Sequence, residues 1–191
     1  MRRMTLGALL KQTLENGSDD LVTRPTGARL RERIEEALAD GGGPELVVLD
    51  FGDVGIIDYS CADEIVAKLA SRLAAGEYGS KYVALAGLNR HQEENIEVAL
   101  ERKKLALLYL GGPEGWKLLG TLNAYLRETL HLVMGQEQLT ARALAERLRL
   151  ELNTASTRLI NLHKLRLVAR REEPVSNGGR QFVYRSLLKE A

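Results

Sequence analysis

The sequence predicts a two-domain α/β chain, in which a mostly parallel sheet with helices precedes a smaller helical domain that ends in a β-hairpin. Apolar runs at residues 46–49, 82–86 and 105–110 alternate with segments of helical periodicity, an order typical of a parallel sheet with right-handed crossovers. After Gly120 the pattern changes to helices followed by two strand-like segments. The charge changes there too: residues 121–191 carry 12 Lys and Arg against 7 Asp and Glu, whereas the preceding residues carry 15 against 19.

The segment before the first apolar run is predicted to be mainly helical. We expect a short helix over residues 5–16, a loop over 17–20 and a short strand over 21–23. A second helix over 27–40 is indicated by apolar residues at i, i+4, i+7 and i+8, and the Gly-Gly-Gly-Pro sequence at 41–44 ends it. The apolar stripe of this helix is Leu30, Ile34, Ala37 and Leu38.

The three apolar runs are the predicted strands of the sheet. Residues 46–49 show no polar alternation, which is typical of a strand buried on both faces, and such strands are usually parallel. Helices follow the first and second runs, one ending near Gly76 and one largely polar. Their inner stripes are Ala62, Ile65, Val66, Leu69 and Leu73 in the first and Ile96, Ala99 and Leu100 in the second. Residues 116–119 are expected to return as a hairpin strand.

The last third of the chain predicts helices and a hairpin. The expected elements are helices over 121–134, 141–148 and 153–165 and strands over 168–172 and 181–185. Thr140 and Asn153 are predicted N-caps because their side chains accept bonds from free helical N–H groups. Gly135 is a predicted C-cap.

Composition excludes several classes of protein. A single cysteine allows no internal disulfide, and a reducing cytoplasm is the default compartment. The apolar run at residues 6–10 is cut by Lys11 and Gln12, too early for a signal peptide, and no later run approaches the length of a membrane span. We therefore expect a cytoplasmic protein without a membrane partner.

The stretch VVLDFGDVGIIDYSCADEI, residues 47–65, marks the passage from a buried strand into a helix. Ser60 and Asp63 have the spacing of a capping box, which is one interpretation of this serine. The other is a regulatory phosphosite, since a helix N-terminus favours negative charge. A phosphate on Ser60 would however meet Asp58 and Asp63 as like charges.

VVLDFGDV followed by IDYSCADE resembles the STAS domains, the fold of the anti-sigma-factor antagonists, and the related STAS-like domains of unresolved role. The likeness covers roughly residues 21–110. It places Ser60 at the hydroxyl that a histidine-kinase-like serine kinase phosphorylates in the antagonists, and it groups Asp58 and Tyr59 with it as a candidate partner-switch site. Tyr59 and Cys61 depart from the first hydroxyl and the glycine of the family motif.

The predicted third helix of the C-terminal part carries residues suited to a DNA major groove. Ala155, Leu159 and Leu162 are spaced to face a core. The residues left outward are Thr154, Ser156, Thr157, Arg158 and Asn161. Hydroxyls suit phosphates and Arg suits guanine, and Arg180 in the hairpin turn is placed for a phosphate or a narrow minor groove. The alternative is that these are only solvated polar positions.

Residues 139–184 resemble the winged helix-turn-helix proteins, most closely the MarR-like regulators. LHKLRLVAR matches the turn into the wing and SNGGRQFVY the wing tip with its return strand. Arg166 stands where that family commonly has glycine. The resemblance implies a domain that binds double-stranded DNA, and some winged helices bind protein instead.

An enzyme is disfavoured by what surrounds the acidic residues. Asp50, Asp53 and Asp58 could form a Mg²⁺ or phosphoryl site only with a hydroxyl and a Lys at neighbouring strand ends, and those ends read ALAGLN and LGG. The three histidines show no metal-ligand spacing. We therefore expect no catalytic residue, metal or cofactor.

Together these observations predict a prokaryotic transcriptional regulator. Residues 1–115 would be a STAS-like regulatory domain, with residues 1–20 as an extension, and residues 116–191 a winged helix-turn-helix that binds DNA. The helix at 121–134 carries more apolar residues than such a domain needs, which indicates a homodimer or contact with the first domain. The alternative is a partner-switching protein of the anti-sigma-factor-antagonist type, which binds a serine kinase or an anti-sigma factor and whose winged helix docks protein.

Overall fold

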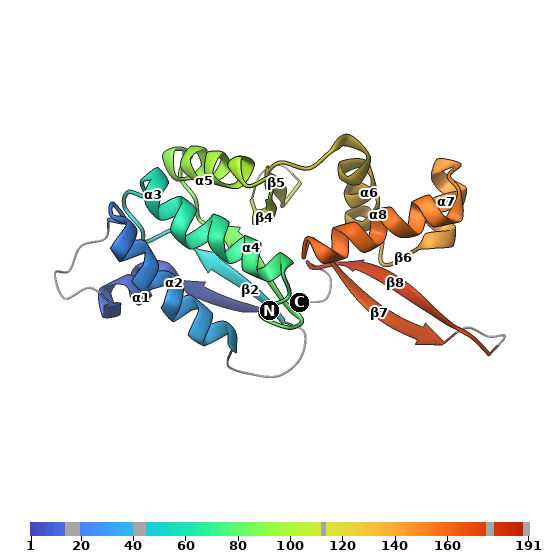
Figure 1. Cartoon of the computed structure of the whole chain (residues 1–191), viewed down its shortest axis with the longest axis horizontal. Helices are drawn as coiled ribbons and strands as arrows, with labels where there is room; N and C mark the ends of the chain where they lie inside the picture. Colours follow the sequence, from blue (N-terminus) through green and yellow to red (C-terminus); the bar gives the residue numbers. More distant parts are fainter. Residues whose placement is uncertain (14–19, 40–44, 112–113, 175–177, 189–191) are drawn as a thin grey trace. The chain divides into compact units, whose positions relative to one another are not determined.

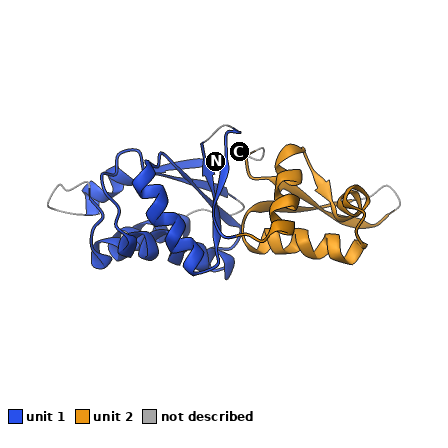
Figure 2. Cartoon of the chain, turned by 90° about the horizontal axis from the view of Figure 1, so that it is seen from above, with its two compact units in different colours: residues 1–121 blue, residues 122–191 orange. Residues whose placement is uncertain are grey.

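The computed structural model describes residues 1–13, 20–39, 45–111, 114–174 and 178–188. The chain divides into two compact units, unit 1 over residues 1–121 and unit 2 over residues 122–191 (Figures 1 and 2). The division falls later than the expected boundary between residues 115 and 116. The reason is that residues 117–120 pair with a strand of unit 1 and complete its sheet.

Unit 1 is built on a five-stranded sheet whose strands lie in sequence order. The strands are β1 (Arg2–Thr5), β2 (Glu45–Asp50), β3 (Lys81–Ala86), β4 (Ala106–Leu110) and β5 (Lys117–Gly120). The pairs from β1 to β4 are parallel and β5 is antiparallel to β4. The mostly parallel sheet and its return strand are therefore confirmed, whereas β1 was not predicted.

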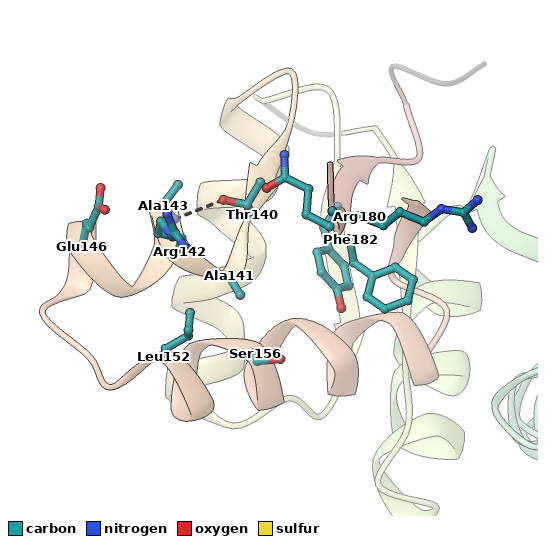
Figure 3. A pocket seen from close by; sticks show the side chains of 12 residues that line it. Thr140, Ala141, Arg142, Ala143, Glu146, Leu152, Ser156, Arg180 and Phe182 are labelled. Carbon is teal, nitrogen blue, oxygen red and sulfur yellow. Dashed lines mark hydrogen bonds between the residues drawn. The ribbon is translucent and has the colours of Figure 1, made fainter. Parts of the chain in front are cut away.

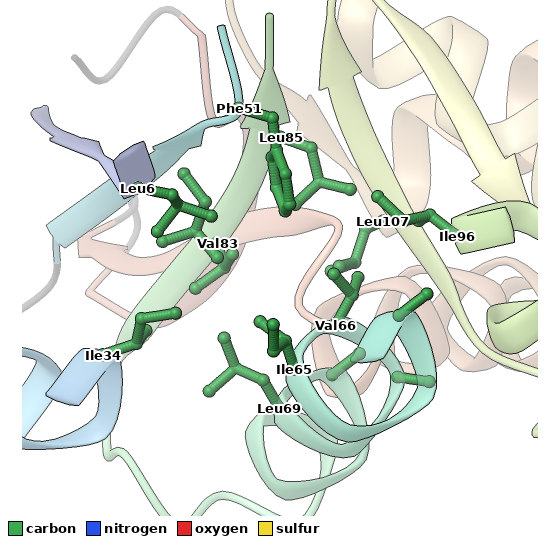
Figure 4. Close-up of a cluster of buried hydrophobic side chains, with 14 of the residues drawn as sticks. Leu6, Ile34, Phe51, Ile65, Val66, Leu69, Val83, Leu85, Ile96 and Leu107 are labelled. Carbon is green, nitrogen blue, oxygen red and sulfur yellow. The ribbon is translucent and has the colours of Figure 1, made fainter. Parts of the chain in front are cut away.

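The helices of unit 1 bury their apolar stripes against one face of this sheet. They are α1 (Leu6–Thr13), α2 (Arg24–Ala39), α5 (Arg90–Arg102) and a long helix made of α3 (Tyr59–Ala62), the π-helical η1 (Asp63–Ala67) and α4 (Lys68–Ala74). Figure 4 shows Ile34, Ile65 and Ile96 from three of them around Val83 and Leu85 of β3. This apolar burial provides most of the stabilisation of unit 1.

The unbroken apolar runs are explained by burial on both faces. Val47 and Leu49 of β2 lie in the helix-covered core, and the alternate residues Leu46 and Val48 are buried as well. All six residues of β3 are buried. The middle of a strand with two buried faces has no position for an unpaired polar residue, so its sequence shows no alternation. Lys81, at the start of β3, is buried but pairs with Glu45 at 3.1 Å.

Some expected elements of unit 1 differ in extent. The strand expected at residues 21–23 is only an isolated bridge between Leu21 and Ile57, because α2 already begins at Arg24. The helix expected at residues 5–16 begins at Leu6, after β1. Residues 14–19 and 40–44, which include parts of two expected loops, lie outside the described residues.

Unit 2 contains three helices and a small antiparallel sheet in the part that the structure describes. Its elements are α6 (Ala124–Gly135), β6 (Leu139–Thr140), α7 (Ala141–Leu148), α8 (Leu152–Lys164), β7 (Val168–Pro174) and β8 (Arg180–Ser186). The strand order is β6-β8-β7, so the short β6 pairs with the second strand of the hairpin. The helices and the hairpin match the prediction, and β6 was not foreseen.

The caps of unit 2 agree with the sequence at one position and differ at two. Thr140 caps α7 by accepting from the Ala143 N–H at 3.2 Å, as predicted. Gly135 is instead the last residue of α6, which Gln136 caps in an extended conformation. The N-cap of α8 is Glu151, so Asn153 lies in the first turn and is not a cap.

The turn after α8 contains a residue in the left-handed conformation. Arg166 has φ of 60°, a left-handed conformation that costs a side chain more than it costs glycine. This agrees with the departure noted at that position. Taken over the described ranges, every helix is too short or too polar to cross a bilayer.

Candidate nucleic-acid interface and candidate switch site

A groove of about 580 Å³ lies between α7, α8 and β8 of unit 2 (Figure 3). Arg142 lies on α7, Leu152 and Ser156 on α8, and Arg180 and Phe182 on β8. The groove therefore brings together Ser156 and Arg180, two of the predicted DNA-contacting residues. This surface offers donors from Arg142, Ser156 and Arg180 and an exposed ring from Phe182, although the Arg180 side chain extends away from Ser156 (Figure 3).

The groove carries charges of both signs. Arg180 is 75% exposed and pairs with Glu172 at 3.2 Å, an ion pair of the exposed kind that contributes little. Arg142 is exposed and lies four residues before Glu146 on α7, and Glu146 lines the same groove. Sequence reasoning missed Arg142, because it lies on the short second helix and the prediction considered only the third helix and the hairpin.

A second hollow, of about 420 Å³, lies along α8 beside Tyr125 of α6. It is lined by Tyr125, Asn153, Thr154, Thr157, Arg158 and Asn161. Thr154 and Thr157 are exposed, whereas Ala155, Leu159 and Leu162 are buried. The helical spacing therefore predicted correctly which face of α8 is outward.

Arg158 is the predicted interface residue whose surroundings differ most from expectation. Its side chain is only 16% exposed and lies 3.2 Å from the carboxylate of Glu128. Its guanidinium also lies 5.2 Å from the centre of the Tyr125 ring, a cation–π arrangement. Reaching a DNA base would require Arg158 to leave both partners, so it is held as part of the surface of unit 2.

In unit 1 the helix that follows β2 is capped by Asp58 and not by Ser60. The carboxylate of Asp58 accepts from the Cys61 N–H at 2.7 Å, and the Ser60 hydroxyl donates to the same carboxylate at 2.9 Å. The predicted N-cap role of Ser60 is therefore wrong. Asp58 has the extended backbone of an N-cap residue, which places Ser60 in the first turn.

The loop before Asp58 is held by side chains of α5. Gln92 donates to the carbonyl oxygens of Val54 and Gly55 at 2.7 and 3.1 Å, and Asn95 donates to that of Ile57 at 2.9 Å. The sequence offered no indication of this, since Gln92 and Asn95 look like ordinary polar residues of a polar helix. These bonds fix the backbone that presents Asp58.

Two exposed apolar residues lie beside this candidate switch site. Ile56 is 60% exposed and Val22 is 50% exposed, and the Leu21 N–H donates to the Ile56 carbonyl at 2.7 Å. The backbone pairing therefore holds the two side chains on neighbouring segments. Exposed apolar residues held on a fixed backbone are suited to binding a protein.

The neighbours of Ser60 have structural roles. Tyr59 packs under the guanidinium of Arg102, which lies 4.7 Å from the ring centre. Burial, together with the negative charge of Asp58, raises the pKa of the Cys61 thiol to about 12. Because the thiolate is the reactive form, Cys61 is poorly suited to redox sensing.

Asp50, at the end of β2, and Asp58 have separate structural roles. Asp50 accepts from the Gly52 N–H at 3.0 Å and pairs with Arg3 at 3.3 Å, whereas Asp58 caps a helix. Within the described ranges, no group of three or more His, Cys, Asp and Glu side chains is placed to hold a metal ion.

A cluster of ion pairs joins α2 to the π-helical segment. The side chain of Glu64 is 4% exposed and accepts from Lys68 at 2.7 Å, Arg24 at 3.0 Å and Arg31 at 3.3 Å. Arg31 also pairs with Glu35 at 2.6 Å. The sequence did not reveal this cluster, because its members come from helices that lie more than 30 residues apart. Its role is to orient α2 on the helix that carries Ser60.

Comparison of the chain with protein-family models, with curated proteins and with solved structures found no match in any of the three.

Proposed function

We propose that the chain is a DNA-binding transcriptional regulator. In this proposal unit 2 is a MarR-like winged helix-turn-helix that binds double-stranded DNA, and unit 1 is a STAS-like domain that senses a signal or binds a partner. One observation carries the proposal: the order α6, β6, α7, α8, β7, β8, with the sheet order β6-β8-β7 and a groove between α7, α8 and β8 that is lined by Arg142 and Arg180 as well as Glu146. In this arrangement α8 is the recognition helix, since an α-helix of this kind enters the major groove of DNA.

The charge distribution supports DNA as the partner of unit 2. Residues 121–191 have a net charge of +5, whereas residues 1–120 have −4. Arg142 and Lys164 are exposed near opposite ends of the helix-turn-helix, and Arg180 is exposed on the hairpin. Cationic side chains placed around a helix bind phosphates and release counterions, which provides most of the non-specific affinity.

The proposed roles of α8 and of the β7–β8 hairpin determine how unit 2 would bind DNA. In the proposal α8 lies in the major groove and the hairpin is the wing, from which Arg180 contacts a phosphate or an adjacent narrow minor groove. A homodimer would place two such helices about 34 Å apart, one turn of DNA, on a two-fold site. Sedimentation of the full chain tests the dimer: a monomer that binds a two-fold site no better than one half-site would contradict it.

Binding to labelled duplex DNA at several salt concentrations tests the function. Full-length protein should bind, and Arg180→Ala and Arg142→Ala should each flatten the slope of log K against log salt by about 0.9, the value for one phosphate contact. Arg33→Ala is a matched control, because Arg33 is an exposed arginine on α2 of unit 1. Absence of binding at low salt, or equal slopes in all four proteins, would refute the DNA-binding function.

A second candidate function is partner switching, in which unit 2 docks a protein. It is favoured by the exposed Val22 and Ile56 beside Ser60. A phosphate on Ser60, added by a histidine-kinase-like serine kinase, would lie against the Asp58 carboxylate that now accepts from the Ser60 hydroxyl, and repulsion would weaken the helix cap.

Substitution of Ser60 tests whether Ser60 belongs to a partner-switch site, whereas the DNA titrations above separate the two candidates. Ser60→Glu and Ser60→Ala should differ in partner binding or in regulation in cells, while both remain folded. Equal behaviour of the two variants, with equal loss of stability, would leave Ser60 a structural role only.

A further inference from the structure

We infer that α8 reads adenine–thymine base pairs in the major groove, with the amides of Asn153 and Asn161 as adenine readers and Thr154 and Thr157 as thymine contacts. This inference rests on the proposed DNA-binding function. It concerns the sequence that the helix selects, which the element order does not determine.

The four side chains form one outward stripe. Ala155, Leu159 and Leu162 of α8 are fully buried, and the stripe lines the hollow on the other side of the helix. Residues 153, 157 and 161 are spaced at i, i+4 and i+8, so they span two turns of helix, about 12 Å. That length corresponds to between three and four base steps of about 3.4 Å.

The chemistry of the stripe favours adenine and thymine over guanine. Guanine is read mainly by Arg or Lys, adenine by the bidentate amide of Asn or Gln, and thymine by apolar contact with its methyl group. Arg158, the arginine beside the stripe, is held by Glu128 and by the Tyr125 ring. Lys164 is the last residue of α8, beyond the residues that line the hollow.

The hydrogen-bonding state of the stripe agrees with these roles. The Thr157 hydroxyl donates to the Asn153 carbonyl at 2.8 Å, so its proton is already used and its methyl group remains for an apolar contact. Because Glu151 is the N-cap of α8, the Asn153 amide is not used in capping. In the part of the chain that the structure describes, neither the Asn153 nor the Asn161 side chain forms a hydrogen bond.

Selection of bound duplexes from a randomised library by the full-length protein, followed by titration of the selected site, tests this inference. We expect A·T pairs at the strongest positions of each half-site. Replacing one such adenine by 7-deazaadenine removes only its major-groove N7 acceptor, and replacing thymine by uracil removes only its methyl group. The 7-deazaadenine duplex should bind roughly 5- to 100-fold more weakly, the range for one bidentate contact.

Protein variants locate the effect on α8. Asn153→Ala and Asn161→Ala should each reduce the preference for the selected duplex over a G·C-substituted one by at least about 5-fold while retaining binding to both. Gln138→Ala is the control, since Gln138 is an exposed amide outside α8 and should leave the preference unchanged.

The outcomes separate this inference from the function on which it rests. If no duplex binds at low salt, the DNA-binding function fails and the inference with it. If DNA binds but the selected site is G·C-rich, shows no sequence preference, or tolerates both base analogues without loss, the inference alone is overturned.

Discussion

Replacing Glu64 with glutamine removes the negative charge at the centre of the ion-pair cluster in unit 1 while changing the shape of the side chain very little. The carboxylate accepts from Lys68, Arg24 and Arg31. The free-energy cost of losing the carboxylate differs among these three partners, because their side chains are exposed to different degrees. The cost is therefore the sum of one buried contribution and two exposed ones.

The exposed contributions are small. The side chains of Arg24 and Lys68 are 52% and 46% exposed, so both can return to water, and such pairs are worth about 0–1 kcal/mol each. Arg31 is 10% exposed and cannot. Removing the partner of a buried charge costs about 3–5 kcal/mol, but Arg31 retains Glu35 and the new amide oxygen still accepts. We therefore expect a loss of about 2 kcal/mol for Glu64→Gln.

Urea unfolding followed by tryptophan fluorescence measures this loss of stability in unit 1, the unit that contains Glu64. Trp116 is the single tryptophan of the chain and belongs to unit 1, so its emission reports the unfolding of that unit. With a urea dependence of about 1–3 kcal/mol per molar, the midpoint should fall by roughly 1 M.

Glu36→Gln is the matched control for this experiment. Glu36 lies on α2, is 65% exposed and pairs only with the exposed Arg33 among the residues described, so its substitution should change stability by less than about 0.5 kcal/mol. The reasoning fails if Glu64→Gln is as stable as the wild type, or if the two substitutions cost the same.

Three further predictions concern unit 1. Burial opposes ionisation of Glu64, but the hydrogen bonds from Lys68 and Arg31, together with their positive charges, outweigh it and lower the pKa of Glu64 below 4.5. The stabilisation that the Glu64 carboxylate provides is therefore present above about pH 4.5 and lost as the pH falls further. Acid titrations should show a shallower loss of stability in Glu64→Gln than in the wild type. Gly87→Ala should cost about 1–3 kcal/mol in the urea assay, because φ is +70° and the new methyl group would collide with the Asp50 side chain and the Gly52 backbone. Gly79→Ala is the control and should cost less, since φ is +58° but nothing lies within 4 Å of the new methyl group. Asp58→Ala should cost about 1 kcal/mol as the loss of an N-cap, and a larger effect from Ser60→Ala would contradict the assignment of the cap to Asp58.

The elements that the sequence predicted well are those whose own residues determine them. The strands β2 and β3 are apolar apart from Glu45, Asp50 and Lys81 at their ends, and β4 is apolar throughout, because their central residues are buried on both faces. By contrast β1 has the sequence Arg-Arg-Met-Thr and β6 has two residues. Such short segments become strands because a neighbour offers them hydrogen bonds, which no local pattern records.

The same distinction applies to the candidate sites. Helical periodicity was sufficient to place Thr154 and Thr157 on the outer face of α8. It could not show that Arg158 is held by Glu128, because that partner lies on another helix, 30 residues away in the sequence. Nor could it decide between Asp58 and Ser60 as the cap, since both residue types accept from helical N–H groups and only the backbone conformation distinguishes them.

The reversed direction of β5 determines where the chain leaves unit 1. Gly120 pairs with Ala106, the first residue of β4, so the exit lies at the edge where the parallel strands begin. The cap at Asp58 follows the other end of β2, about a strand length away, roughly 15–20 Å. The helix α5 bridges that distance, because Gln92 near its start holds the loop before Asp58 and Leu100 near its end lies against Gly120. If a ligand tilted α5, the residues around Gly120 at the end of α5 would move, and with them the point at which the chain enters unit 2. A ligand that only reordered the side chains around Asp58 would leave that point unchanged.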